Sequence, residues 1–300
     1  MVYYVQEDRK MKTKQAKYTA KHFEKEFASD DACLEWLKNY RFPDGIECST
    51  CKKVTKHYKI AKRPCYKCDL CGHEVYPTAG TIFHKSSTPL KVWFEAMFWM
   101  ATTRSGHSAK ELQRRTGVTY KTAWRMFKQI RTLLDENEGM FKNEVEIDET
   151  YIGGKRRGDN QGRPAEGSHK IPVIGIAERE GKVSVKAVAN VKRSTVMPLI
   201  AKNVERKTII YTDEYSVYNT LDDMGFDHIK CNHANGQYVI GNAHTNTIEG
   251  FWSLVKRGIG GVYHAVSPKY LQSYLNEYQF RYNHRLDSAP MFQTVLNQIR

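Results

Sequence analysis

The chain has 300 residues, 40% of them hydrophobic, which is enough for two or three compact domains with at least one apolar core. It carries 47 Lys and Arg against 33 Asp and Glu, a formal charge of +14, so nucleic acid is the expected partner. No apolar stretch approaches the roughly 20 residues that span a bilayer, and the charged amino terminus lacks the apolar core of a secretion signal. These features exclude a membrane protein, and we expect the chain to act in the cytoplasm.

After a helical segment expected over residues 1–42, the cysteine pattern predicts a zinc ribbon over residues 43–86. Two pairs of cysteines, each pair with two residues between its members, are separated by 16 residues: Cys48, Cys51, Cys68 and Cys71. Four thiolates in this spacing close a tetrahedron around one structural Zn²⁺, which stabilises a segment too small for its own core. Cys65 offers a rival pair with Cys68, but Cys71 is followed by the glycine typical of a second metal-binding turn. We therefore place Cys65 outside the site.

Residues 87–138 have helical periodicity and predict a DNA-binding region of the helix-turn-helix type. Ser108 and Glu111 form the pattern of a capping box, Thr116-Gly117-Val118 predicts a turn, and Thr119 can cap a second helix. Three basic residues lie on one polar face of that second helix, as a helix in the major groove requires: Lys121, Arg125 and Lys128. A merely solvated charged face is the alternative to DNA reading.

Residues 139–300 predict an α/β domain with two aspartates at the ends of apolar strands. Asp148 follows Val145-Glu146-Ile147, and Asp213 follows Ile209-Ile210-Tyr211-Thr212. A carboxylate in such a position is costly unless it is paired or binds a metal, so two of them in one sheet indicate a shared divalent ion. Glu249, on a predicted helix, is a candidate for the third ligand.

In these segments the chain resembles the DDE transposase and integrase superfamily, and specifically bacterial insertion-sequence transposases with an amino-terminal zinc ribbon. The likeness rests on CSTC and CDLCG with GTIFHKSSTPL after them, on EIDETYIGGK, on YTDEYSVY and on HTNTIEGFWSLVKRGIGGVYH. It implies a ribonuclease H-like catalytic domain, a central sheet flanked by helices, with Mg²⁺ or Mn²⁺ held by Asp148, Asp213 and Glu249.

The same resemblance assigns further residues around the third carboxylate. Lys256 matches the lysine that lies beside that carboxylate in the superfamily, and seven residues place it on the same helical face as Glu249. Lys256 and Arg257 are therefore candidates for phosphate contact, with a solvated pair as the alternative. Because related families use asparagine as the third catalytic residue, Asn246 is an alternative or auxiliary ligand to Glu249.

The resulting hypothesis is a DNA transposase that cuts insertion-sequence ends and joins them to target DNA by two-metal-ion phosphoryl transfer. Its partners would be double-stranded DNA, namely terminal inverted repeats and target, and a homo-oligomer on DNA is expected because two ends must be joined. In the cell it would be nucleoid-associated when bound to DNA. Two rivals are a DNA-binding regulator derived from an inactive transposase, and a nuclease of the same fold that resolves DNA junctions.

Overall fold

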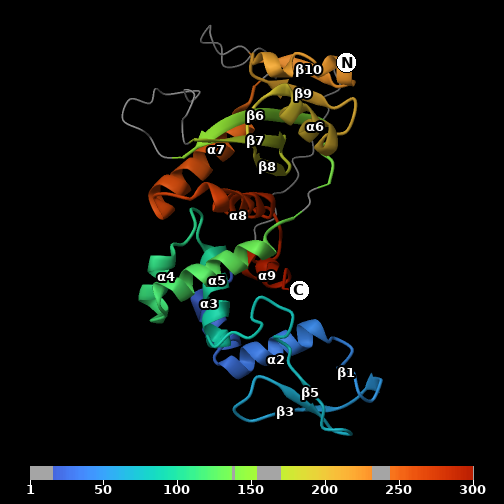
Figure 1. Cartoon of the computed structure of the whole chain (residues 1–300), viewed down its shortest axis with the longest axis vertical. Helices are drawn as coiled ribbons and strands as arrows, with labels where there is room; N and C mark the ends of the chain where they lie inside the picture. The colour runs from blue at the N-terminus through green and yellow to red at the C-terminus, as the bar shows by residue number, and fades with distance from the viewer. Residues whose placement is uncertain (1–15, 137–138, 154–169, 232–243, 300) are drawn as a thin grey trace, which may run out of the picture.

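The computed structural model describes residues 16–136, 139–153, 170–231 and 244–299. Figure 1 shows an elongated molecule with the small strands β1 to β5 at one end, a group of helices in the middle and the large sheet at the other end. None of the helices in the described part of the chain combines the length and apolarity that a bilayer crossing needs.

The amino-terminal helices carry the ribbon. They are α1 (Ala20–Glu26) and α2 (Asp30–Arg41), which begin at the capping side chains of Thr19 and Ser29. The ribbon strands are β1 (Glu47–Cys48), β2 (Lys53–Val54), β3 (His57–Lys59), β4 (Tyr66–Cys68) and β5 (Glu74–Val75). Tyr66 donates to Glu35 of α2 at 2.6 Å, and Lys59 pairs with Asp31 of α2 at 2.6 Å. These polar contacts join the ribbon to α2.

The middle of the molecule is a helical core. It contains α3 (Leu90–Thr102), α4 (Ala109–Thr116), α5 (Tyr120–Leu133) and α9 (Met291–Leu296). Ser108 and Thr119 cap α4 and α5 as expected, and Gly117 ends α4 with a φ of 73°. The capping-box prediction holds only in part, because Glu111 accepts from Arg114 and Arg115 at 3.3 and 3.1 Å.

Residues from the two ends of the chain share this core. Phe292, Val295 and Leu296 of α9 are buried in the same apolar cluster as Phe23 of α1 and Phe98 of α3. The carboxyl-terminal segment therefore packs on the amino-terminal helices rather than on the large sheet. The domain boundaries given above stay predictions.

The large sheet has five strands in the order β10-β9-β6-β7-β8. Its strands are β6 (Glu144–Ile152), β7 (Ile171–Glu178), β8 (Val183–Ala187), β9 (Ile209–Thr212) and β10 (Asp227–Lys230). β6, β7 and β8 pair antiparallel, whereas β9 is parallel to both β6 and β10. This mixed sheet, flanked by helices, is the ribonuclease H-like arrangement expected from the sequence.

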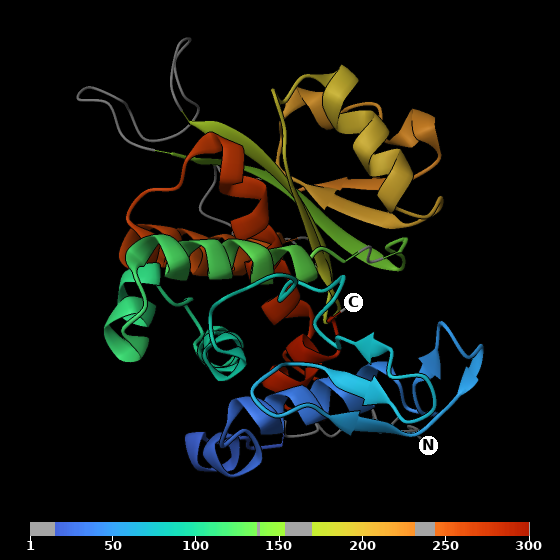
Figure 2. The same ribbon diagram turned by 60° about the horizontal axis from the view of Figure 1, so that its bottom comes forward.

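Helices cover both faces of the sheet, as Figure 2 shows. On one face lie α7 (Asn246–Gly258) and α8 (Leu271–Asn283), joined by η3 (Ile259–Tyr263) and η4 (Pro268–Tyr270). On the other lie α6 (Arg193–Asn203), η1 (Ser216–Tyr218) and η2 (Asp222–Met224). Alternate residues of β6 separate the two faces, because Val145 and Ile147 pack with α6 while Ile152 packs with α7.

Helix α8 protects one edge of the sheet and connects it to the helical core. Gln279 and Asn283 accept hydrogen bonds from backbone amides of β8 at 2.9 and 2.7 Å. These amides face the open edge of the sheet, so the two side chains supply the partners that a further strand would otherwise provide. Glu277, fully buried, accepts from Arg131 of α5 and from Tyr263 at 2.5 and 2.9 Å. Because this carboxylate needs both donors in the protein interior, it fixes α5 against α8.

Candidate active site and metal centres

The four predicted cysteines of the ribbon come together. Their sulfurs all lie within 4.8 Å of one another, with Cys48 Sγ 3.5 Å from Cys71 Sγ and Cys51 Sγ 3.9 Å from Cys68 Sγ. A tetrahedral zinc with Zn–S bonds of about 2.3 Å places its sulfurs roughly 3.8 Å apart, so the cluster fits the metal. Thr55 Oγ1 lies 3.2 Å from Cys68 Sγ, and its hydrogen bond lowers the pKa of that thiol to about 5. A thiolate is the form that binds zinc.

Cys65 provides a matched control for this metal centre, since it is buried and outside the cluster. We expect one zinc per chain in the wild type, none in Cys68→Ser and one in Cys65→Ser, measured by atomic absorption. Chelation should unfold the ribbon, because bound zinc contributes on the order of 10 kcal/mol to such a segment. Retention of zinc by Cys68→Ser would contradict the site.

The two predicted aspartates, Asp148 and Asp213, lie side by side because of the register of the sheet. Glu146 of β6 pairs with Tyr211 of the parallel strand β9, so two residues further on Asp148 and Asp213 are level with each other. Asp148, Asp213 and Glu149 each offer an oxygen, and these oxygens all lie within 4.8 Å of one another. Three carboxylates at this separation suit a hard divalent cation, so the residues present fit the metal that the resemblance implies.

Asp148 is held by the helix that crosses the sheet. Trp252 Nε1 of α7 donates to Asp148 Oδ2 at 3.1 Å. The position opposite Asp148 on β7 is Gly175, and a Cβ there would lie 2.5 Å from the Trp252 ring and 2.6 Å from Ile248. The missing side chain therefore lets α7 approach the sheet. Burial, followed by the charges of Glu149 and Asp213, raises the pKa of Asp148 to about 7.

Glu249 and Lys256 face the same pocket as Asp148. The pocket, of about 390 Å³, is also lined by Glu149, Trp252 and Arg257. Thr245 donates to Glu249 Oε1 at 2.8 Å, which orients the carboxylate. Asn246 is the first residue of α7, one turn before Glu249, and is exposed.

Glu149 is a member of the cluster that sequence reasoning missed. Strand alternation predicts that it points away from Asp148, and its carboxylate does accept from Tyr218 of η1, on the α6 side, at 2.9 Å. It still offers an oxygen to the group formed with Asp148 and Asp213, whereas Glu249 is not one of those three. The acidic run EIDET was the signal in the sequence.

Glu146 is a second missed residue, and it holds the start of α7. It is fully buried and accepts from the backbone amides of Thr247 and Ile248 at 2.7 and 3.0 Å. Arg179 donates to Glu146 at 3.1 Å and to the backbone oxygen of His244 at 2.8 Å. A carboxylate at a helix amino terminus satisfies amides that have no partner inside the helix. Through α7, Glu146 therefore sets the positions of Asn246 and Glu249.

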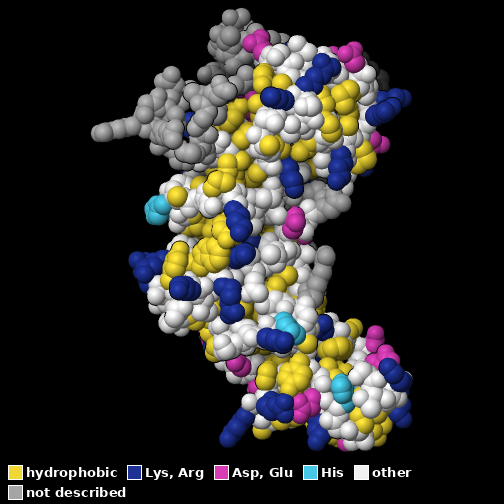
Figure 3. Space-filling view, viewed as in Figure 1, with side chains coloured by type: hydrophobic (Ala, Val, Ile, Leu, Met, Phe, Trp, Pro, Cys, Tyr) yellow, Lys and Arg dark blue, Asp and Glu magenta, His cyan; other side chains and the backbone are white. Residues whose placement is uncertain are grey.

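The basic face predicted for the second helix is present on α5. Lys121, Arg125 and Lys128 are all exposed. Two of them lie against aromatic rings: the Arg125 guanidinium is 6.0 Å from the centre of Trp93, and Lys128 Nζ is 5.3 Å from that of Tyr270. Figure 3 shows Lys and Arg side chains spread over this side of the molecule, with fewer Asp and Glu among them.

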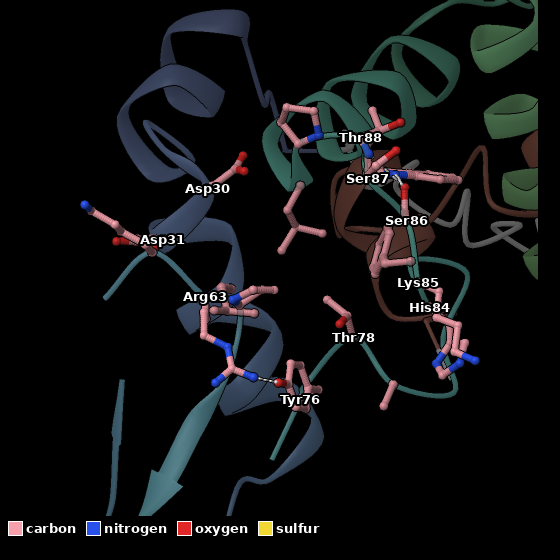
Figure 4. A pocket seen from close by; sticks show the side chains of 18 of the residues that line it. Asp30, Asp31, Arg63, Tyr76, Thr78, His84, Lys85, Ser86, Ser87 and Thr88 are labelled. Carbon is pink, nitrogen blue, oxygen red and sulfur yellow. Dashed lines mark hydrogen bonds between the residues drawn. The ribbon is translucent and has the colours of Figure 1, made fainter. Parts of the chain in front are cut away.

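A cleft of about 700 Å³ lies between the ribbon, α2 and the segment before α3 (Figure 4). Figure 4 shows Arg63 pointing toward Tyr76, to which it donates a hydrogen bond. Arg63 also pairs with Glu74 at 2.7 Å, and Lys59 pairs with Asp31. These two cations are therefore compensated by carboxylates at the joint between the ribbon and the helices.

Known families match both the part of the chain that contains the ribbon and the part that contains the carboxylate cluster. The family described as the ISXO2-like transposase domain matches residues 140–283, and the transposase zinc-ribbon domain matches residues 28–74. The chain belongs to the IS1595 family of insertion-sequence transposases. The matched ranges include all four clustered cysteines and the carboxylates Asp148, Glu149, Asp213 and Glu249.

Two relatives, compared by sequence, agree with this membership. A protein of the transposable element ISH50 of Halobacterium salinarum is 28% identical over 275 residues, which cover 86% of this transposase and 92% of that protein. A transposase-like protein of Haemophilus influenzae is 30% identical over 102 residues, 34% of this chain and 81% of that one. The Mos1 transposase paired-end complex is 13% identical, covers 64% of this chain and 75% of that chain, and has a TM-score of 0.29.

Proposed function

We propose that this transposase cleaves DNA at the ends of its insertion sequence and joins the freed ends to target DNA at the Asp148 site. The observation that carries the proposal is the meeting of Asp148, Asp213 and Glu149 oxygens within 4.8 Å, beside a pocket that Glu249 and Lys256 also line. Divalent metal ions bound there, Mg²⁺ or Mn²⁺, would activate the attacking oxygen and stabilise the leaving oxygen. Water would be the first nucleophile, and the freed 3′-hydroxyl the second.

The protein residues have separate roles in this scheme. Asp148 and Asp213 would hold the cations from two neighbouring strands, and Glu249 would complete the ligand set from α7, with Asn246 as the auxiliary. Lys256 and Arg257, which line the pocket as exposed cations, pair with phosphates next to the scissile bond. Trp252 fixes Asp148 through its indole N–H, which keeps the carboxylate directed into the pocket.

Double-stranded DNA is the proposed substrate, in the form of terminal inverted repeats and target. The net charge of +14 supports it, and so does the exposed basic face of α5, which we propose reads the repeat. Since two element ends have to be joined, we propose that the transposase works as a homo-oligomer on DNA.

The test is to map strand breaks in DNA from both flanks of the transposase's own gene, incubated with the protein and Mg²⁺ or Mn²⁺. Nicks at defined repeat ends, followed by joining to a target plasmid, are the expected result. Binding to the repeats without any metal-dependent nick would instead support a regulator derived from an inactive transposase. Cleavage of any branched DNA without joining would support a junction-resolving nuclease.

A further inference from the structure

A second cleft, of about 890 Å³, opens next to the catalytic pocket. It lies between the second half of α7, the end of α8, the segment that follows α3 and residues 16–19. Arg257 lines both this cleft and the pocket that contains Asp148 and Glu249. The two hollows therefore meet at one side chain of α7.

The charge of this cleft is of one sign. Among the described residues that line it, every charged one is basic and none is Asp or Glu. The basic residues are Lys17, Arg104, Arg257, Arg281 and Arg285. Lys17, Arg104 and Arg257 are exposed, and within the described ranges none of the three lies within 4 Å of a carboxylate. Cations without a carboxylate partner in a concave surface concentrate the field that attracts a polyanion.

Part of the cleft is already ordered for ligand binding. The Arg285 guanidinium lies 3.7 Å from the centre of the Tyr282 ring, and it donates to the backbone oxygens of Gly181 and Tyr282 at 3.1 and 2.6 Å. Arg281 forms the floor, where it pairs with the buried Glu277. A stacked, hydrogen-bonded guanidinium loses little conformational entropy when it binds a phosphate.

We propose that this cleft binds the phosphodiester backbone of the DNA strand that continues from the scissile phosphate in the Asp148 pocket. Arg257 would contact the phosphate at the junction, and Arg104 and Lys17 would contact the phosphates that follow along the cleft. The inference rests on the proposed function for the identity of the strand. It adds a binding surface formed by segments outside the catalytic domain, since Lys17 and Arg104 flank α1 and α3.

The experiment measures equilibrium binding of the full-length double variant K17E/R104E to DNA at several salt concentrations, with Ca²⁺ in place of Mg²⁺. The slope of log K against log salt is negative, and each lost phosphate contact reduces its magnitude by roughly 0.9. We therefore expect the magnitude of the slope to decrease by about 2. The affinity near 0.1 M salt should fall roughly 10- to 100-fold. The control is K202E/R206E, which makes the same charge change at exposed positions in and after α6, on the opposite face of the sheet.

Two duplexes of equal length distinguish the sources of the phosphate. If K17E/R104E loses affinity for the element-end duplex alone, the cleft binds the element strand. If it loses affinity equally for an unrelated duplex, the cleft binds the backbone of any DNA. A slope for K17E/R104E equal to that of K202E/R206E would overturn the proposal. Because binding is measured without strand cleavage, that result can be told apart from failure of the catalytic hypothesis, which the mapped strand breaks report.

Discussion

Asp148→Asn is expected to abolish strand cleavage and leave DNA binding nearly intact. The amide keeps the size of the side chain and its contact with Trp252, but it removes the negative charge that a hard cation requires. Loss of groups that only support metal ligands costs about 10- to 100-fold, so removal of the ligand itself should lower the cleavage rate by at least about 100-fold. Quantified nicking and a parallel binding titration measure the two effects, and equal loss of both would refute the assigned role.

The same substitution should raise stability when no metal is bound. The pKa of Asp148 is raised from its ordinary value of 3.8 to about 7, so ionising this carboxyl costs free energy in the folded state. The wild type therefore loses stability as pH rises from 4 to 7, and the penalty is complete above 7. At pH 8 with no Mg²⁺ or Mn²⁺ added, Asp148→Asn should melt higher than the wild type by roughly 2 to 4 °C per kcal/mol removed.

At pH 4 this advantage should disappear, because the wild-type carboxyl is then protonated when folded. The matched control is Asp223→Asn, an exposed aspartate of η2, which should show no such pH-dependent gap. Added Mg²⁺ should raise the Tm of the wild type and not that of Asp148→Asn. A wild type that melts above the variant at pH 8 without metal would show that Asp148 is not destabilised by its neighbours.

Local patterns in the sequence predicted most of the elements around the site. The apolar runs that end near Asp148 and Asp213 became the neighbouring strands β6 and β9, and the capping residues marked the starts of α4 and α5. Strand β10 was missed, because it is a four-residue edge strand with mostly exposed side chains and no apolar run. Periodicity detects elements that bury a face, and this strand buries little.

The interactions that position the site were harder to predict because they join residues far apart in the chain. Glu146 contacts Thr247 across 101 positions, and a glutamate in a strand pattern gives no sign of a helix terminus that folds onto it. The packing of α9 on α1 and α3 is similarly invisible, since any apolar segment could fill that place. Glu149 could be grouped with Asp148 only from the positions of Asp213 at the end of β9 and of the Tyr218 hydroxyl, which the sequence does not give.

Glu146→Ala is expected to damage both stability and catalysis, although Glu146 is not among the clustered metal-ligand candidates. Its removal leaves the amides of Thr247 and Ile248 without their acceptor and Arg179, whose side chain is 13% exposed, without its buried partner. Breaking a buried charge pair in this way costs about 3 to 5 kcal/mol. That cost corresponds to a fall in Tm of roughly 6 to 20 °C for a domain of this size.

Arg179 also provides the control, because it pairs with Glu144 at 3.2 Å through a carboxylate that is 39% exposed. Glu144→Ala removes this more exposed carboxylate partner of Arg179. It should change the free energy of unfolding by no more than about 1 kcal/mol. Glu146→Gln, which keeps an acceptor oxygen for the α7 amides, should fold better than Glu146→Ala and recover part of its cleavage activity. Equal cleavage by the wild type and Glu146→Ala would mean that α7 needs no anchor on β6 to place Glu249. Full recovery of cleavage in Glu146→Gln would assign the role of Glu146 to its hydrogen bonds rather than to its charge.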